Sequence, residues 1–548
     1  MRTFGAGSEE RQLPVRLAAS ADVLIPVSLY GLALLVGLAA SAVVRFPLSE
    51  GSSYYVEVAR NLAGGRGLVI DAIWSYATPP LVLPRPAFEL WQPLTSLIAA
   101  LPMPLLGSTF ETAQLALALL GALAAPLAWA VGRDAARRAG LSDRRLSGVA
   151  VGSGLIAAIF GPFVLATVAP DSTLPFLIFG TLACLLMRPA MAGKWMAGLA
   201  LGLALGLAFL SRMEAIYLGV TFLALSSVAW RATGIRLGAA LRVLAPVIAG
   251  GLLVTVPWLL RNLVTFGSAF PGQALDNALL THNEQIFAYT ERPNVEQFLA
   301  QGPELIAGHV ARALEHGLVD VLLVPGGPLI ALGLLSAVAL VRREELRVST
   351  LGALLGSGLL IYVLTSLVFP VATLWGTFRH ASGPLLLGLL ISAVMGADWL
   401  VARLREMRGW QRSNAWLAPF ALLVFTLPLT IVQLWFASSQ AYDQRERLES
   451  LHAALLALPS GPLITDRPIW ISQEVGRQAL VLPDEPSASV LQLARDFRAP
   501  AVLIVEQRRG YPAALRSEEA AACFVEQPLG AGAPPETALF LLREECLP

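Results

Sequence analysis

The sequence predicts an all-α polytopic membrane bundle of about eleven spans, followed by a small C-terminal α/β domain. Three observations predict this fold class. The 548-residue chain is 56% hydrophobic and only 14% charged, whereas average soluble domains carry about 25% charged residues. Apolar stretches of spanning length recur from residue 22 to residue 437. Beyond residue 437 the composition changes to that of a soluble domain.

Each span is predicted from its length and apolarity. A bilayer core about 30 Å thick needs about 20 apolar residues in a helix, and about 17 to 25 are tolerated. The stretch 196–230 is divided at Ser211–Glu214, because one helix of about 35 residues would be about 52 Å long. The apolar stretch Pro93–Leu106 is shorter, and we expect it to be interfacial or re-entrant. The predicted spans are 22–44, 109–132, 149–169, 173–187, 196–211, 215–230, 243–260, 321–341, 348–369, 383–402 and 415–437.

Arginine placement predicts the orientation, because basic residues concentrate in cytoplasmic loops. With this span count all the basic clusters fall on one side, which predicts a cytoplasmic N-terminus over 1–21 in a multi-pass plasma (inner) membrane protein. The first apolar run is full span length and is read as a retained anchor. The outward parts are then loops 45–108 and 261–320 and the segment 438–548. The basic clusters lie within 1–21, 133–148, 188–195, 231–242, 342–347 and 403–414.

The outward segment 438–548 reads as a small α/β unit with parallel strands. Residues 463–466 and 501–506 resemble short buried strands, and residues 487–498 resemble a helix between them. Cys523 and Cys546 both lie in this segment, on the side where a disulfide is permitted. Their pairing stays open, because spacing alone does not establish the geometry that a disulfide needs.

Ionisable residues gather at the outward span ends, where burial near the membrane makes them costly unless they serve a cavity, a partner or a substrate. If the bundle brings these ends together, they form one cavity that holds acids and bases. The residues are Glu50, Asp171, Arg212, Glu214, Arg261, Arg379 and His380.

Each of these residues also has a simpler explanation. Arg261 and Arg379 are alternatively snorkelling interface anchors. Asp171 is alternatively a helix cap, and Arg212 and Glu214 alternatively pair across a helix break. For Glu50 the alternative is a solvated loop charge, and for His380 a structural role.

Aromatic residues are dense in the first outward loop, where Trp74 and Tyr76 are candidates for a surface that contacts a sugar or a prenyl chain. Their alternative is an interfacial aromatic belt. His282 and Glu284 form a second polar group in loop 261–320. Two candidate ligands do not define a metal site, so no cofactor is predicted with certainty and a divalent cation stays open.

Four short motifs, in order and on one predicted side, resemble the GT-C superfamily of polyprenyl-phosphate-sugar glycosyltransferases. The resemblance covers about residues 22–440 and is strongest to the family 39-like branch of protein O-mannosyltransferases and lipid A aminoarabinose transferases. The motifs are Tyr54-Tyr-Val-Glu-Val-Ala-Arg-Asn-Leu62 with Gly65-Arg-Gly67, Ala169-Pro-Asp171, Pro257-Trp-Leu-Leu-Arg-Asn262 with Phe266-Gly267, and Thr377-Phe-Arg-His380.

The resemblance implies a donor lipid phosphate held near the outer face and an acidic residue of the first outward loop acting on the acceptor. The family's aspartate falls on Gly51, so the nearest acid, Glu50, is predicted to replace it. Asp171 is predicted as a second catalytic acid that positions the acceptor or a metal. Arg261, Arg379 and His380 are predicted to bind the donor phosphate. The predicted contacts of the acceptor or the donor are Tyr54, Tyr55, Trp74, Tyr76, His282 and Glu284.

Three function classes follow. The leading one is an enzyme of cell-envelope glycosylation that transfers a sugar, with inversion, from a polyprenyl-phosphate donor to an acceptor lipid, glycan or protein. The second is a non-catalytic relative that binds polyprenyl lipids or partners, which Gly51 favours. The third is a lipid or sugar transporter, which would show inverted repeats and broken helices near the midplane. A net charge of +1 with scattered basic residues indicates no nucleic-acid partner.

Overall fold

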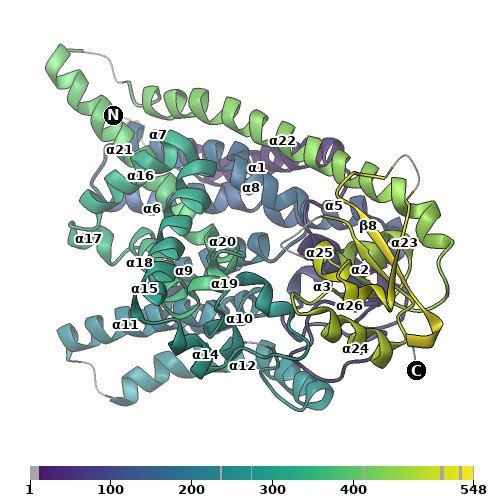
Figure 1. Cartoon of the computed structure of the whole chain (residues 1–548). Coiled ribbons are helices and arrows are strands. Elements are labelled where there is room, and N and C mark those ends of the chain that lie inside the picture. The colour runs from purple at the N-terminus through teal and green to yellow at the C-terminus, as the bar shows by residue number, and fades with distance from the viewer. Residues whose placement is uncertain are drawn as a thin grey trace, which may run out of the picture.

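The computed structural model describes residues 12–546, apart from 235–236, 273, 411–413, 507–510 and 530–532. Long helices lie side by side in a bundle, and the strands gather at one end of it (Figure 1). We call this the sheet end. The bundle helices are α1 Gln12–Val43, α5 Phe110–Gly121, α6 Ala124–Arg138, α7 Asp143–Ile159, α8 Gly161–Val168, α9 Thr173–Met191, α10 Trp195–Ser211, α11 Ala215–Thr233, α12 Leu237–Phe266, α15 Pro303–His316, α16 Val324–Leu340, α18 Thr350–Val368, α21 Gly383–Arg408 and α22 Leu417–Leu456.

Helices coincide with every predicted span, which confirms the polytopic all-α fold class. Within the described ranges, nine helices are long and apolar enough to cross a membrane. The predicted span 149–169 is the pair α7 and α8, bent by 45° at a break next to Pro162, whose ring and missing N–H interrupt a helix. The predicted span 196–211 is α10, a helix of 17 residues at the lower limit for crossing.

Two predicted loops contain more helix than expected. Helix α15 lies in the predicted loop 261–320 and continues through the π-helical segment Gly317–Leu323 into α16, so that residues 303–340 form one long apolar unit. The stretch Pro93–Leu106 forms α3 Leu94–Ala100 and α4 Met103–Leu106, with Leu101 and Leu105 exposed.

Small residues allow a close helix contact in the bundle, between α10 and α12. A Cβ added at Gly202 would lie 2.1 Å from the carbonyl oxygen of Val247, and one added at Gly250 would lie 2.3 Å from that of Leu199. Glycine at both positions therefore lets the two backbones touch, which is the usual way in which membrane helices associate.

A six-stranded mixed sheet covers the sheet end. Its strand order is β2-β5-β4-β6-β8-β7. The neighbours from β2 to β6 pair in parallel, whereas β8 pairs antiparallel with both β6 and β7. The strands and helices of this region are β2 Ala72–Ile73, β4 Leu463–Thr465, β5 Ala479–Val481, β6 Ala501–Ile504, β7 Phe524–Gln527, β8 Ala538–Leu542, α23 Pro468–Val475, α24 Ser487–Phe497, α25 Tyr511–Leu515 and α26 Glu518–Ala521.

The sheet does not belong to the C-terminal segment alone. Strand β2 comes from the predicted loop 45–108 and pairs with β5, Ile73 opposite Leu480. Helix α22 runs without a break through the predicted boundary at residues 437 and 438. Side chains of the first loop and of the C-terminal strands share one hydrophobic core. The α/β unit with parallel strands is thus present as predicted, but it is joined to the first loop.

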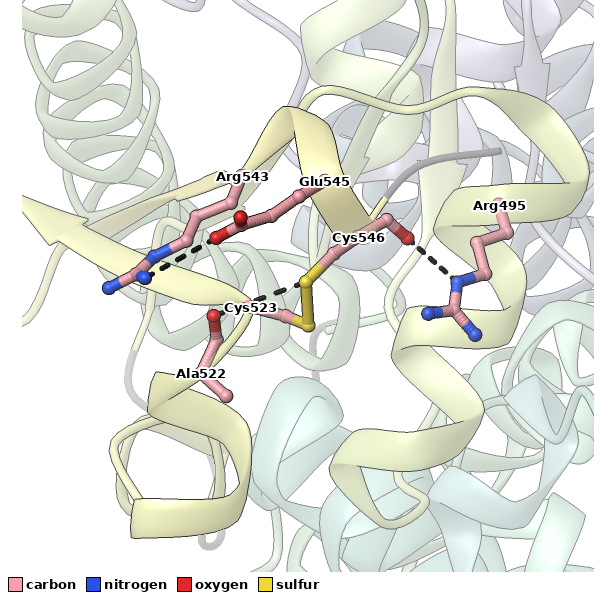
Figure 2. Close-up of a disulfide and its surroundings, with 6 residues drawn as sticks. All are labelled: Arg495, Ala522, Cys523, Arg543, Glu545 and Cys546. Carbon is pink, nitrogen blue, oxygen red and sulfur yellow. Dashed lines mark hydrogen bonds and ion pairs between the residues drawn. A yellow bond between two sulfur atoms is a disulfide. The ribbon is translucent and has the colours of Figure 1, made fainter.

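Cys523 and Cys546 form a disulfide, with their Cα atoms 5.7 Å apart (Figure 2). The bond links the start of β7 to the last described turn of the chain. The carbonyl oxygen of Cys546 accepts a hydrogen bond of 2.7 Å from Nε of Arg495 on α24. The pairing that the sequence left open is therefore formed, and it attaches the end of the chain to the C-terminal unit.

Candidate active site

Helix α2, Glu50–Ala63, lies between the bundle and the sheet and organises the site. It begins at Ser49, whose extended backbone lets its hydroxyl accept the N–H of Ser52 at 3.2 Å, a typical helix cap. Tyr54 and Tyr55 are both buried, with ring centroids 5.9 Å apart and planes at 87°. Because neighbouring side chains on a helix point about 100° apart, these two rings face different groups of residues.

On the Tyr55 side lies Asp171, in the break before α9. Its Oδ1 accepts the N–H of Thr173, the first residue of α9, at 2.7 Å, which is the kind of contact that the helix-cap alternative describes. Its Oδ2 also lies 3.4 Å from Nδ1 of His380 on α20, Thr377–Ala381. Burial favours the neutral acid, but the charge of His380 and the hydrogen bonds from His380 and Thr173 outweigh it and lower the pKa of Asp171.

Arg212 connects this acid to the next helix break. It pairs with Glu214 at 2.6 Å, as the ion-pair alternative predicted. It also donates to the hydroxyl of Ser172 at 3.1 Å and to the carbonyl of Thr377 at 3.3 Å. Burial raises the pKa of the Tyr55 hydroxyl, although the charge of Arg212 opposes it. The Asp171 cluster is defined as Tyr55, Asp171, Ser172, Arg212, Glu214 and His380.

On the other side, Tyr54 belongs to an aromatic layer. Its ring lies 4.3 Å from that of Trp91, and its hydroxyl accepts the N–H of Phe88 at 2.6 Å. The Phe88 ring lies 5.8 Å from that of Trp258. The guanidinium of Arg261 lies 4.9 Å from the centre of the Trp258 ring, a cation–π contact. Arg261 is thus held against aromatic rings at the edge of the site.

The aromatic layer continues to the surface through residues that come from three segments. Trp74 lies 5.0 Å from Trp91 and 4.9 Å from Phe287. Phe287 lies 5.2 Å from Trp375, which is 38% exposed. Sequence reasoning missed Phe287 and Trp375. The available signal was their position, three residues after Glu284 and two before Thr377 respectively.

A buried ion pair supports this layer and was also missed. Arg85 is fully buried and donates to the carbonyls of Ser75 and Thr78. Its guanidinium lies 3.5 Å from the carboxylate of Glu89. A buried charge is costly unless it is paired and hydrogen-bonded, so Arg85 fixes the fold of the loop that carries Trp74 and Trp91.

Glu50 and Glu57 contact the C-terminal unit. Glu50 accepts the N–H of Ile469 at 3.0 Å, and its second oxygen lies 3.7 Å from Arg467. Two turns later, Glu57 accepts the hydroxyl of Ser472 at 2.7 Å and the N–H of Asp71 at 2.9 Å. Burial raises the pKa of Glu57 to about 7. The structure therefore brings Asp171 together with His380 and Tyr55, whereas Glu50 contacts Arg467 and Ile469 at the start of α23.

The other predicted residues occupy separate places. Arg379 is exposed on α20 beside His380. Tyr76 donates to the carbonyl of Val481 at 2.5 Å and so belongs to the sheet. His282 lies 3.0 Å from the hydroxyl of Thr281, just before the short helix Asn283–Phe287 that contains Glu284.

A metal site was left open by the sequence. In the part of the chain that the structure covers, no group of three or more His, Cys, Asp or Glu side chains lies close enough to hold a metal ion. Neither the Asp171 cluster nor His282 and Glu284 therefore offers a complete set of protein ligands.

Two solved structures share this architecture. ArnT from Cupriavidus metallidurans bound to undecaprenyl phosphate aligns over 95% of this chain and 98% of its own, with 15% identity and a TM-score of 0.55. The oligosaccharyltransferase of Archaeoglobus fulgidus aligns over 95% of this chain and 75% of its own, with 13% identity and a TM-score of 0.53. No family model and no curated protein matches. At these identities the likeness shows the fold alone, and it is the fold that these two structures share.

Proposed function

We propose that this GT-C chain is a membrane glycosyltransferase that moves a sugar from a polyprenyl-phosphate donor to an acceptor at the outer face of the plasma (inner) membrane. The observation that carries the proposal is the Asp171 cluster, a charged group enclosed between helix breaks at the sheet end. A structural neighbour with the same fold, ArnT, was solved with undecaprenyl phosphate.

The reaction needs a base and a site for the departing phosphate. In an inverting transfer, the acceptor oxygen forms a bond to the anomeric carbon while the bond from that carbon to phosphate breaks. The acceptor proton passes to a carboxylate, and polyprenyl phosphate leaves. Arg261, Arg379 and His380 would stabilise the phosphate charge, since guanidinium groups suit phosphate oxygens.

Asp171 is the better supported of the two proposed acids. Its lowered pKa keeps it ionised at neutral pH, and His380 beside it connects it to the α20 segment that carries Arg379. The carboxylate of Glu50 instead contacts a backbone N–H and Arg467. We therefore assign the acceptor proton to Asp171 and keep Glu50 as the alternative base.

The orientation proposed from the arginine clusters agrees with the disulfide. Cys523 and Cys546 are bonded in the unit at the sheet end, and structural disulfides persist mainly in oxidising compartments. This supports a cytoplasmic N-terminus, with the sheet end and the Asp171 cluster outside.

The second candidate function is binding of polyprenyl lipid without transfer. Gly51 stands where the family has its aspartate, and the contacts of Glu50 with α23 favour a structural role for the nearest acid. For the leading candidate the acceptor is a lipid, a glycan or a protein, and each would present its nucleophilic oxygen at the cluster.

The test is donor-dependent labelling in membranes that contain the chain. Vesicles receive a panel of radiolabelled polyprenyl-phosphate sugars, and both label transfer and donor binding are measured. The Asp171→Asn variant is compared with Asp22→Asn, a matched change at an exposed ion pair with Arg133. Transfer that is lost only in Asp171→Asn supports the proposal. Donor binding without transfer in the parent chain would support the non-catalytic candidate.

A further inference from the structure

A polar cavity of about 310 Å³ lies apart from the Asp171 cluster, where α1, α2, α5, α22 and α23 meet. It is lined by charged side chains of both signs that come from these different elements. They are Arg45, Arg60, Glu111, Arg445, Glu449 and Glu474.

The charges of this cavity are balanced. Arg445 pairs with Glu449 at 2.7 Å, and Nε of Arg60 is buried without a hydrogen-bond partner among the described atoms. Arg60 acts electrostatically on Glu474. The three carboxylates would repel a ligand that is only negative, and the three guanidinium groups would repel one that is only positive. The best complement is a small group that carries both a negative and a positive charge.

The cavity lies at the ends of membrane-spanning helices. The span of α1 ends at Val43, two residues before Arg45, and the span that starts with α5 begins at Phe110, which lines the cavity. Side chains at span ends lie at the level of lipid headgroups. Phe46 and Phe110 add apolar walls beside the charged groups.

We propose that this cavity binds a headgroup that contains both a phosphodiester and a primary ammonium, as in phosphatidylethanolamine. Arg60 and Arg45 would bind the phosphate, because guanidinium forms charge-assisted hydrogen bonds with phosphate oxygens. Glu111 and Glu474 would accept hydrogen bonds from the ammonium. The bound headgroup would connect the α1 and α5 corner of the bundle to α23. This site is independent of the proposed transfer reaction.

The test measures lipid binding to the full chain in detergent by native mass spectrometry. The probes are phosphatidylethanolamine, phosphatidylcholine, whose ammonium has no N–H, phosphatidylglycerol, which has no amine, and soluble glycerophosphoethanolamine. We expect phosphatidylethanolamine to bind about tenfold more tightly than the other two lipids. Equal binding of the three lipids would overturn the proposal. If glycerophosphoethanolamine binds as tightly as the lipid, the headgroup assignment holds and the source is soluble.

Two variants separate the two ends of the headgroup. Arg60→Gln should weaken both phosphatidylethanolamine and phosphatidylglycerol about tenfold, because each has a phosphate. Glu111→Gln, a change at an exposed residue, should remove the preference over phosphatidylcholine and leave phosphatidylglycerol unchanged. Arg403→Gln and Glu406→Gln, at an exposed ion pair outside the cavity, are the matched controls. Lipid preference that is unchanged in Glu111→Gln rejects the ammonium assignment, even if Arg60→Gln fails to fold.

Discussion

Asp171 and His380 form the central contact of the candidate site, with Oδ2 of the acid 3.4 Å from Nδ1 of the imidazole. Thr173 touches both, since its N–H binds Asp171 at 2.7 Å and its hydroxyl lies 3.0 Å from His380. The contact joins the break before α9 to α20, which are far apart in the sequence. It therefore places a carboxylate beside the segment proposed to hold the donor phosphate.

Replacing Asp171 by Asn should stop most sugar transfer and leave donor binding intact. The amide keeps the oxygen that caps Thr173 but cannot take the acceptor proton, and loss of a general base typically costs about 10² to 10⁴ in rate. Transfer rates and donor affinity are measured on the same vesicles. A parental rate in Asp171→Asn would show that another group is the base.

Replacing Glu50 by Gln should slow transfer less than Asp171→Asn does. The amide can still accept the N–H of Ile469, and Arg467 keeps its ion pair with Glu506 when the 3.7 Å pair with Glu50 is lost. A fall in Tm is expected, because the pair is largely buried, together with at least about a tenth of the parental rate. A fall in rate of about 10² or more with unchanged donor affinity would return the base role to Glu50.

Glu57 should make the contact between α2 and α23 sensitive to pH. Its pKa is raised to about 7 in the folded protein, so the folded state holds a proton that the unfolded state has released. Stability is therefore greatest at low pH, falls as the pH rises from about 4.5 to about 7, and levels off above. The loss is on the order of 3 kcal/mol.

The Glu57→Gln variant tests this pH dependence. Its amide can accept the N–H of Asp71 and donate to Ser472, so both contacts remain while the titrating group is removed. Thermal unfolding is followed at pH 5 and pH 8, with exposed Glu406→Gln as the control. The variant should show a smaller difference in Tm between the two pH values than the parent. An unchanged difference would assign the pH effect to another group.

Arg261 and Arg379 should both matter for donor affinity. An Ala change removes charge-assisted hydrogen bonds to phosphate, so each variant should bind the donor about tenfold or more weakly, with partial rescue by Lys. Binding of a labelled polyprenyl phosphate is measured, with Arg403→Ala as the control because its ion pair is exposed. Unchanged affinity in both folded variants would leave them as snorkelling anchors.

Cysteine labelling should reveal the orientation. Residues 144 and 82 are both exposed, and the predicted topology places them on opposite sides of the membrane. With an impermeant reagent outside intact cells, Arg144→Cys should be protected and Val82→Cys should react. The native cysteines do not interfere, because Cys184 is buried and the other two are bonded. The reverse labelling pattern would place the Asp171 cluster on the cytoplasmic side.

The membrane bundle and the parallel strands of the C-terminal unit could be predicted from the sequence. Apolar length and periodicity are local properties, so span positions, and strands such as 463–465, could be read along the chain. The helix-cap role of Asp171 and the pairing of Arg212 with Glu214 were also foreseeable, because each joins residues that are close in sequence.

Which charged residues contact one another depends on the packing of distant segments and could not be predicted from the sequence. The direction of Glu50 depends on α23, which lies more than 400 positions away in the chain, and no local pattern contains that contact. The same holds for β2 joining the C-terminal sheet and for Trp375 completing the aromatic layer with Phe287 and Trp74. Loop residues acquire their partners only when distant segments pack, so the sequence could nominate site residues but could not group them.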